Sequence, residues 1–558
     1  MTTTNRVSKF NKRWEALKSE RSSFIPLWRE LSDHHLSHRG RFLASDRNKG
    51  YKRNTKQFNN TSRQSVRTLA SGMMAGITSP ARPWFRLSVS DPKLRESAAV
   101  KEWLHTVQGT MYEVFSSSNL YNALHTIYSE LGVFGIGAIG VYDNYDNVIH
   151  CRPYTVGSYA LALNGMNEVD TFYREYDITV AQCVKRYGLD NCSNHVKQQW
   201  NKGNTEAWVT VVHAIEPNDD RDQMSPLAKD KRYRSVYYEK SKGQAEPTQF
   251  LRESGFDSFD VLTPRWDVTA EDVYATDCPG MTALGDVKAL QLGERRMYQA
   301  LDKLVDPPLQ GPSSLKAKVG TSLRPGEILY HQAGEGKGLS SIYDFRPDLN
   351  AIVTLNDRVE ERIKKAFYED LFLMLSNSDR RQITAREVAE KHEEKLLMLG
   401  PVLERLHSEL LDPLIDLTFN KLQAAGVLPV PPRELQNMEL KVEYVSILAQ
   451  AQRLVAAGSL ERLGNYVGQL TQVWPEARHK FDAMQAVDEY SESLGTSPSV
   501  VRSDDKVAEI LAQEQQAEQQ RQAMEQAAAM AQTAKTTSEI DSTEGTPIAE
   551  AMRQAGIG

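Results

Sequence analysis

The chain has 558 residues, of which 40% are hydrophobic and 25% are charged, a balance that is ordinary for a globular protein of several domains. No apolar run approaches the length of about 18 residues that an α-helical membrane span needs, and the first residues lack the apolar core of a secretory signal. The formal net charge is −6, but residues 1–67 hold 16 Lys and Arg against 5 Asp and Glu, so the remainder of the chain carries −17.

The first third of the chain predicts helices. Residues 6–36 repeat apolar side chains every three or four positions, which indicates two helices separated near Pro26. Residues 38–60 are polar and aperiodic, so we expect a loop there, and residues 62–77 return to helical spacing.

The next segment, residues 77–87, cannot be helical, because Pro80 and Pro83 lie three positions apart. We expect an extended stretch bounded by a turn, with Trp84 and Phe85 as a large aromatic anchor. None of its side chains is a nucleophile, a base or a metal ligand, so the segment is architectural.

Residues 98–134 continue the helical spacing, with a break near residues 116–119. After Gly140 the alternation of valine and tyrosine predicts a β-rich block that contains one helix, at residues 180–187. The strands that we expect in this block cover residues 141–145, 148–154, 207–215, 233–239 and 256–266.

Long helices dominate the next part. Residues 282–305 predict an amphipathic helix of about 36 Å, which two successive prolines end. A Gly-, Pro- and Lys-rich excursion follows, with strand candidates at residues 327–330 and 341–345. Asp348 can cap the next helix, whose apolar stripe continues to Met374.

A polar turn at residues 376–382 precedes a T-x-x-E capping box, which begins a helix reaching residue 425 with disturbances at Pro401 and Pro413. Residues 440–494 predict further, mixed helix. The Gln- and Ala-rich C-terminal part predicts one more helix and then a disordered tail; their ranges are 504–535 and 536–558.

No pattern of catalytic residues is present. The glycines of residues 135–140 follow a helix and precede a strand, the reverse of the dinucleotide-binding order, so they predict close packing of a helix on a sheet. The glycines of residues 334–340 lack the spacing of a phosphate-binding loop, and His34, His35 and His38 have no neighbouring cysteine to complete a metal shell. We expect no catalytic, cofactor-binding or metal-binding residue, and free buried thiols at Cys151, Cys183, Cys192 and Cys278.

The basic first 67 residues are typical of an arm that contacts a polyanion or an acidic partner, although a solvated helical face followed by a loop has the same composition. The helices at 282–305 and 349–375 are too long to bury their stripes in one compact core. They must pack on each other and on something outside the monomer, and a head-to-tail interface that closes generates a ring. An intramolecular hairpin is the alternative.

Residues 79–85 resemble a signature of the portal (head-to-tail connecting) proteins of short-tailed, podovirus-type bacteriophages. The signature residues are Pro80, Arg82, Pro83, Trp84 and Phe85. The order of elements is similar over residues 10–470, with supporting matches at residues 39–42, 130–139, 264–266, 286–290 and 383–387. Residues 274–280 depart from the turn that relatives have there.

The resemblance implies an α+β, mostly helical portal fold that assembles as a ring, typically of twelve subunits. Its parts would be a β-containing wing (1–275), a helical stem (282–305 and 349–375), a small α/β clip (306–348), a channel loop (376–382) and a crown with a long kinked helix (383–500). The C-terminal helix and tail at 504–535 and 536–558 would follow.

The resemblance also implies a structural, non-enzymatic role in the virion, at one capsid vertex, after assembly in the host cytoplasm. The ring would be the channel for packaging and ejecting double-stranded DNA. Its implied partners are the major capsid protein and scaffold, the terminase large subunit, tail adaptor and nozzle proteins, internal core or ejection proteins, and DNA without sequence specificity. A DNA-processing enzyme and a virion scaffold or filament component are the alternatives.

A strongly basic channel would bind DNA phosphates too tightly for the duplex to slide, since every lining residue is repeated around the ring. We therefore expect basic residues in a few rings only. The DNA-channel candidates are Arg380, Arg381, Lys364 and Lys365, and the candidates for DNA or partner contacts in the clip are Lys316, Lys318 and Arg324.

Overall fold

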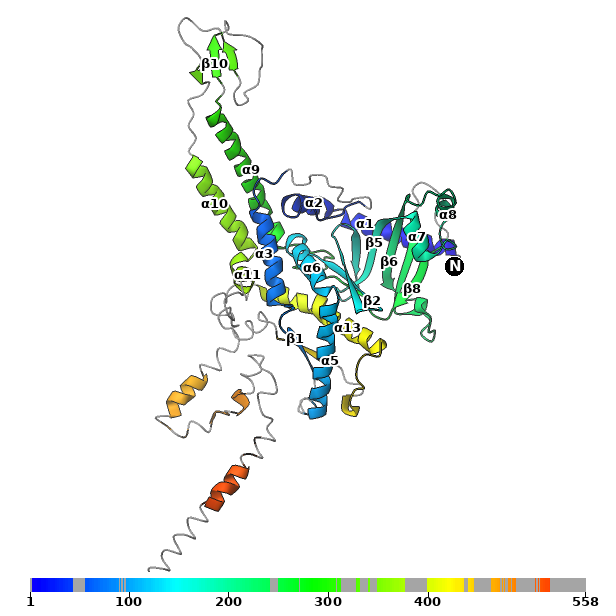
Figure 1. The fold of residues 1–558 in the computed structure, drawn as a ribbon, viewed down its shortest axis with the longest axis vertical. Coiled ribbons are helices and arrows are strands. Elements are labelled where there is room, and N and C mark those ends of the chain that lie inside the picture. Colours follow the sequence, from blue (N-terminus) through cyan, green and yellow to red (C-terminus); the bar gives the residue numbers. More distant parts are fainter. Residues whose placement is uncertain are drawn as a thin grey trace, which may run out of the picture. The chain divides into compact units, whose positions relative to one another are not determined.

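The computed structural model forms two compact units, residues 1–458 and 459–558. It describes residues 3–43, 56–89, 91, 94, 97–240, 249–269, 271–307, 309–312, 328–331, 340–341, 349–376, 399–435, 440–445 and 463–471, and a few short pieces between 474 and 521. The first unit contains the sheets and the long helices (Figure 1). In the second unit, residues 463–471 and 512–521 are helical.

The N-terminal helices form as the apolar spacing predicts. They are α1 (Thr3–Arg21), α2 (Ile25–His34) and α3 (Thr61–Gly76). Pro26 lies in the first turn of α2, where the N–H that proline lacks would have no helical partner. The expected break between two helices is therefore confirmed, and proline begins the second helix.

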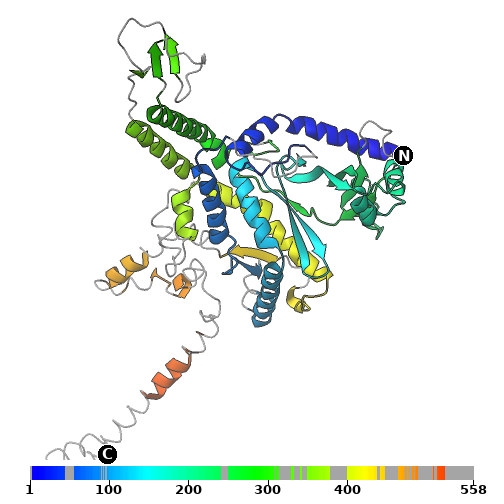
Figure 2. The ribbon, with the colours of Figure 1, turned by 45° about the horizontal axis from the view of Figure 1, so that its top comes forward.

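A five-stranded antiparallel sheet in the order β4-β5-β6-β7-β8 forms the β-rich block. Its strands are β4 (Tyr159–Leu163), β5 (Val169–Thr179), β6 (Trp208–Pro217), β7 (Tyr233–Glu239) and β8 (Arg252–Phe256). Helix α1 lies along one face of the sheet (Figure 1 and Figure 2). Its side chains Val7, Phe10, Trp14 and Leu17 are buried there against residues of β4 to β7. The other face meets α7 (Val180–Tyr187) and α8 (Asn194–Asn201) near one end.

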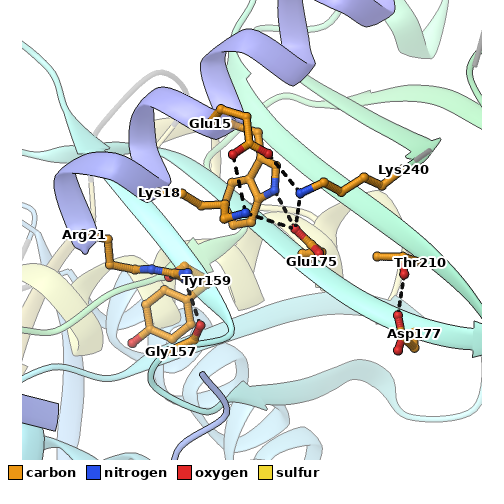
Figure 3. Close-up of polar contacts among 10 residues, drawn as sticks. Glu15, Lys18, Arg21, Gly157, Tyr159, Glu175, Asp177, Thr210 and Lys240 are labelled. Atoms are coloured by element: carbon orange, nitrogen blue, oxygen red, sulfur yellow. Dashed lines mark hydrogen bonds and ion pairs between the residues drawn. The ribbon is translucent and has the colours of Figure 1, made fainter. Parts of the chain in front are cut away.

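Polar contacts fix α1 to this sheet (Figure 3). The Lys240 ammonium donates to carboxylate oxygens of Glu15 and Glu175, at 2.9 Å each. At the end of α1 the buried Arg21 guanidinium donates to the backbone carbonyls of Gly157 (2.8 Å) and Tyr159 (2.6 Å). The helix is thus bonded to the sheet and to the turn that precedes β4.

The largest core surrounds α6 and a second sheet. It involves α5 (Ala98–Ser117), α6 (Leu120–Phe134) and a three-stranded sheet of β3 (Val148–Tyr154), β2 (Ala138–Asn144) and β9 (Val261–Leu262). Gly135 ends α6 with φ of +74°, and a Cβ there would lie 2.6 Å from the Cβ of Ala275. A Cβ at Gly137, next to the start of β2, would lie 2.7 Å from Cγ2 of Ile127 in α6, so the close packing of helix on sheet expected at residues 135–140 is confirmed there.

The strand predictions are correct in part. Strands at 148–154 and 233–239 and the helix at 180–187 have the expected bounds. The single strand expected at 256–266 is wrong, because β8 ends at Phe256 and only the short β9 follows. Strands β4 and β5 and helix α8 were not expected from the pattern.

Two long helices flank a small sheet. They are α9 (Pro279–Val305) and α10 (Leu349–Ala366), which lie side by side (Figure 1 and Figure 2). Between them in sequence are β10 (Leu309–Pro312), β11 (Ile328–His331) and β12 (Ser340–Ser341), in the order β11-β10-β12. Strand β10 was not expected, and Asp348, the expected cap, lies outside the described residues.

The helix expected to run from α10 to Met374 is interrupted. Tyr368 has φ of +53°, a value that a helix cannot contain, and α11 (Glu369–Ser376) starts after it. The apolar stripe is only partly buried, since Val359 and Ile363 are covered and Leu355 is 60% exposed.

The chain returns to the core through a widened helix. A π-helical turn (η3, His407–Leu411) leads directly into α13 (Asp412–Ala424), with Pro413 in its first turn. This confirms the disturbance expected at Pro413, since the proline ring cannot fit into an uninterrupted helix. Gly426, with φ of +68°, follows the end of α13.

Beyond a short 3-10 turn (η4, Arg433–Leu435), β13 (Leu440–Tyr444) pairs antiparallel with β1 (Phe85–Val89). The helix expected from residue 440 is therefore wrong at its start. The capping box and most of the polar turn at 376–382 lie outside the described residues. None of the helices in the described part of the chain combines the length and hydropathy that crossing a membrane requires. The mixture of helix and strand confirms an α+β fold.

Candidate functional site

The aromatic signature is an anchor. Trp84 and Phe85 are 1% and 0% exposed, and both rings pack against Tyr112 and Phe115 of α5. The Tyr112 hydroxyl accepts the backbone N–H groups of Trp84 and Phe85, at 2.9 Å each, and donates to the Phe85 carbonyl at 2.8 Å. One side chain thus satisfies three backbone groups where the chain turns from loop to strand.

The remaining signature residues, Pro80, Arg82 and Pro83, lie in the exposed turn before this anchor. The prolines favour extended backbone in the residues before them, and β1 begins directly after Trp84. Residue 85 pairs with Tyr444 of β13. The signature therefore joins two segments that are far apart in sequence.

Residues 264–266, a further segment on which the resemblance was based, form a second long-range contact. The Arg265 side chain, 5% exposed, forms a two-pronged ion pair with Glu409 in the π-helical turn, at 2.7 Å from Nη2 to Oε1 and 3.3 Å from Nε to Oε2. The backbone N–H of Arg265 donates to Oε2 of the same carboxylate at 2.8 Å. Both prongs of a planar guanidinium are used, which is the strong geometry for this pair.

Residues 39–42 and 130–139, two further segments on which the resemblance was based, lie close together. Glu130 of α6 is fully buried, accepts the Val156 N–H at 3.2 Å and lies 3.7 Å from the Arg39 guanidinium. Burial raises the pKa of Glu130 to about 7, despite that nearby charge. The Arg41 N–H donates to the Val156 carbonyl at 2.9 Å. The structure thus brings residues 39–42 and 130–139 together around residue 156.

Helices α9 and α10 are joined near their middles. A Cβ at Gly293 would lie 2.5 Å from the side-chain oxygen of Asn356, so the two helices approach closely here and a larger residue would displace that side chain. The Asn356 amide donates to Glu294 at 3.1 Å, and Arg362 pairs with Asp286 at 2.8 Å.

The loop that contains Asn59 is hydrogen-bonded to both α9 and α10. Gln291 of α9 accepts the Asn59 N–H at 2.9 Å and donates to the Asn59 carbonyl at 2.9 Å. The Asn59 side chain donates to Glu360 of α10 at 2.7 Å. The proximal parts of both helices are therefore bound to the body of the first unit.

The distal parts are not covered by the described residues. From residue 292 to 305, α9 contains no buried side chain, and α10 contains none before Asn356. The apolar side chains that stay 40% to 76% exposed there are Leu292, Tyr298, Leu301, Leu304, Val305, Val353 and Leu355. Such a concentration of apolar surface on two adjacent helices is typical of an interface.

The structure describes only two of the residues that are candidates for DNA or partner contacts. Lys364 and Lys365 are exposed near the end of α10, and Lys364 lies 3.9 Å from Glu360. The other candidates lie outside the described residues: Arg380, Arg381, Lys316, Lys318 and Arg324.

The histidines do not form a metal-binding cluster in the described chain. The Nδ1 atom of His34 faces the Glu30 carbonyl at 2.9 Å, whereas His35 is buried with its Nδ1 2.6 Å from the Ser62 hydroxyl. Burial lowers the pKa of His35 to about 3, so this ring is neutral.

All four cysteines are free and buried, as expected. Two of them meet, with 3.8 Å between the sulfurs of Cys183 and Cys192, and the Glu239 carboxylate completes a group whose atoms lie within 4.8 Å of one another. Ser193 donates to both Glu239 oxygens. These three side chains are the potential cation ligands of the described residues, and their spacing in sequence contains no metal-binding motif.

Comparison with known proteins places these features in context. The family model described as "Bacteriophage head to tail connecting protein" matches residues 7–501. The "Probable portal protein" of Bordetella phage BPP-1 is 46% identical over 542 residues, and the "Portal protein" of Salmonella phage epsilon15 is 44% identical over 541 residues, with 97% of both chains covered in each case. A chain from the "Virion of native gene transfer agent (GTA) particle" aligns over 79% of this chain and 94% of its own length, with 10% identity and a TM-score of 0.34.

Proposed function

The chain belongs to the bacteriophage head-to-tail connecting protein family and is a structural portal connector, and from this premise we propose that it assembles as a closed ring at one capsid vertex. The ring encloses the channel through which double-stranded DNA is packaged and ejected, and it needs no catalytic residue for this role. A DNA-processing enzyme and a scaffold component are not favoured, because relatives named as portal proteins match almost the whole chain.

The observation that carries the ring proposal is the uncovered apolar surface on α9 and α10. An isolated helical segment as short as the distal part of α9 or α10 is only marginally stable in water, so it needs a packing partner. Each half-exposed leucine or tyrosine that a neighbour covers adds on the order of 1 kcal/mol. A head-to-tail contact that repeats by rotation covers every copy and closes into a ring.

The parts of the ring follow from the family. We assign residues 1–275 to the wing, residues 282–305 and 349–375 to the stem, residues 306–348 to the clip, residues 376–382 to the channel loop and residues 383–500 to the crown. The clip would dock the terminase large subunit during DNA filling and tail adaptor proteins afterwards. The wing would contact the major capsid protein and the scaffold.

The DNA contacts are basic residues in an otherwise acidic ring. Arg380 and Arg381 in the channel loop are the candidates for one ring of positive charge, and Lys364 and Lys365 for another. Replacing Arg380 and Arg381 by alanine should change the retention of packaged DNA, and particles that package and retain DNA like wild type would rule out this role.

The ring is tested by placing a charge on the uncovered surface. We expect the Leu301→Glu/Leu355→Glu variant to lose assembly, because two carboxylates per copy would have to be buried at the interface. Leu301 and Leu355 are 44% and 60% exposed, so the single chain tolerates the change. Light scattering after size-exclusion chromatography measures the mass of each species.

The matched control is Leu227→Glu, because Leu227 is 54% exposed and lies outside α9 and α10. Wild type and Leu227→Glu should elute as one closed oligomer, and the double variant as a single chain. If the double variant keeps the wild-type mass, these helices do not form the ring interface.

A further inference from the structure

The face of the five-stranded sheet that α1 leaves free carries a row of cationic and aromatic side chains. Tyr159, Arg174, His213, Tyr237 and Arg252 are direct partners across β4, β5, β6, β7 and β8. Residues directly opposite each other in a sheet point to the same face. The side chains of Arg174 and Arg252 therefore point to the same face of the sheet as His213.

Two more arginines approach the row from neighbouring elements. Arg186 of α7 lies over the Tyr237 ring, with 5.4 Å from Cζ to the ring centroid, and the His213 ring stacks on the same tyrosine at 4.0 Å. Arg152 of β3 lies over the Tyr154 ring at 5.7 Å. The pKa of His213 is lowered well below its usual value, first by burial and then by the positive charges of these four arginines.

Arg174 is the buried centre of the cluster. It is 5% exposed, and its guanidinium lies 4.7 Å and 4.1 Å from the ring centroids of Tyr154 and Tyr176. Its Nε atom is buried without a hydrogen-bond partner, and so is Nδ1 of His213.

No carboxylate of the described residues forms an ion pair with any of these four arginines. A buried guanidinium is costly without a counter-charge, and contacts with tyrosine rings offset only part of that cost. Four arginine charges therefore lie around His213 without a carboxylate partner among the described residues, and two buried nitrogen atoms, Nε of Arg174 and Nδ1 of His213, have no hydrogen-bond partner there.

We propose that Arg152, Arg174, Arg186, Arg252 and His213 form a binding site for a phosphate group. Planar guanidinium groups bind tetrahedral oxyanions through paired N–H donors. Four positive charges are balanced better by a multivalent anion such as phosphate than by one carboxylate, which carries a single negative charge. The phosphate comes either from the free ion or from a nucleic-acid backbone. The site goes beyond the role of a DNA channel and does not depend on ring formation.

The test is thermal unfolding of the full-length protein in inorganic phosphate against sodium chloride of equal ionic strength. A ligand that binds only the folded state raises the unfolding midpoint in a saturable way. Arg186 and Arg252 are exposed, so Arg186→Gln and Arg252→Gln should fold, and each should weaken the apparent phosphate affinity about tenfold, the value of one hydrogen bond to a charged group.

The matched control is Arg232→Gln. Arg232 is also exposed and lies 5.7 Å from the Tyr233 ring, outside the row, so its loss should leave phosphate binding unchanged. Equal stabilisation by chloride or by acetate, or an equal loss in Arg232→Gln, would overturn the site.

A short DNA duplex provides the second arm. If duplex binding also weakens in Arg186→Gln and Arg252→Gln and not in Arg232→Gln, the phosphate belongs to nucleic acid. If only inorganic phosphate binds in this way, the ligand is the free ion. If neither probe depends on the two arginines, the proposal is wrong.

Discussion

Removal of the Glu409 carboxylate should loosen the junction between the segment around Arg265 and the π-helical turn that leads into α13. In Glu409→Ala the buried Arg265 loses the side-chain hydrogen bonds from Nε and Nη2 and one from its backbone N–H. Leaving one partner of a buried ion pair alone typically costs about 3–5 kcal/mol. Because the Glu409 side chain is 19% exposed, water can form some of the hydrogen bonds that Arg265 loses. We therefore expect Glu409→Ala to lower the free energy of unfolding by about 2–4 kcal/mol.

The Gln variant separates charge from geometry. Glu409→Gln keeps an oxygen that can accept one Arg265 hydrogen bond, so its loss should lie between that of Glu409→Ala and wild type. Glu404→Ala is the matched control, since Glu404 is an exposed carboxylate on the same helical stretch.

Hydrogen exchange measures this local effect directly, because the Arg265 amide itself donates to Glu409 at 2.8 Å. Peptides that cover residues 261–269 should exchange faster by a factor of about 30 or more in Glu409→Ala, the rate equivalent of about 2 kcal/mol. Exchange in Glu409→Ala no faster than in Glu404→Ala would refute the reasoning, and so would equal exchange in Glu409→Gln and Glu409→Ala.

Three further predictions concern the buried groups. The pKa of Glu130 is about 7 in the folded chain against 4.5 as its ordinary value, so the folded state holds a proton that the unfolded chain releases, and stability falls as pH rises through this window. Glu130→Gln should therefore be more stable than wild type at pH 8, by on the order of 3 kcal/mol, but not near pH 4.5; parallel pH profiles of the unfolding midpoint would contradict this. Trp84→Ala should destabilise by about 3–5 kcal/mol and Trp200→Ala by much less in denaturant melts, because their exposures are 1% and 37%. All four thiols should react with a disulfide reagent only slowly in the native protein and fully in denaturant, and rapid native reaction would show that they are accessible.

Local signals predicted the helices and the aromatic anchor from the sequence alone. The apolar spacing of α1 and the proline of α2 depend only on neighbouring residues. The capping box of α7, where Thr179 and Gln182 bond to each other's backbone N–H groups, is equally local, although the prediction of that helix did not use it. Trp84 and Phe85 are large side chains in a stretch that cannot be helical, so burial was a direct expectation.

Strand β5 escaped prediction because its two faces are both partly polar. Arg174 points to the aromatic side and Glu175 to α1, where it accepts hydrogen bonds from Trp14 and Lys240. The alternation of apolar and polar residues that marks a strand is therefore lost.

Features that depend on distant partners could not be predicted. Strand β13 pairs with β1 across more than 350 residues, and the carboxylate that binds Arg265 is 144 residues away. The row around His213 exists only through the register of five strands. The helix break at Tyr368 involves a positive φ at a residue with no marked preference for it.

Electron microscopy of the purified full-length chain tests the central claim most directly. We expect closed rings with an open centre, in which α9 and α10 of one copy lie against the neighbouring copy. Single chains at every protein concentration, or open filaments without a closed channel, would contradict it.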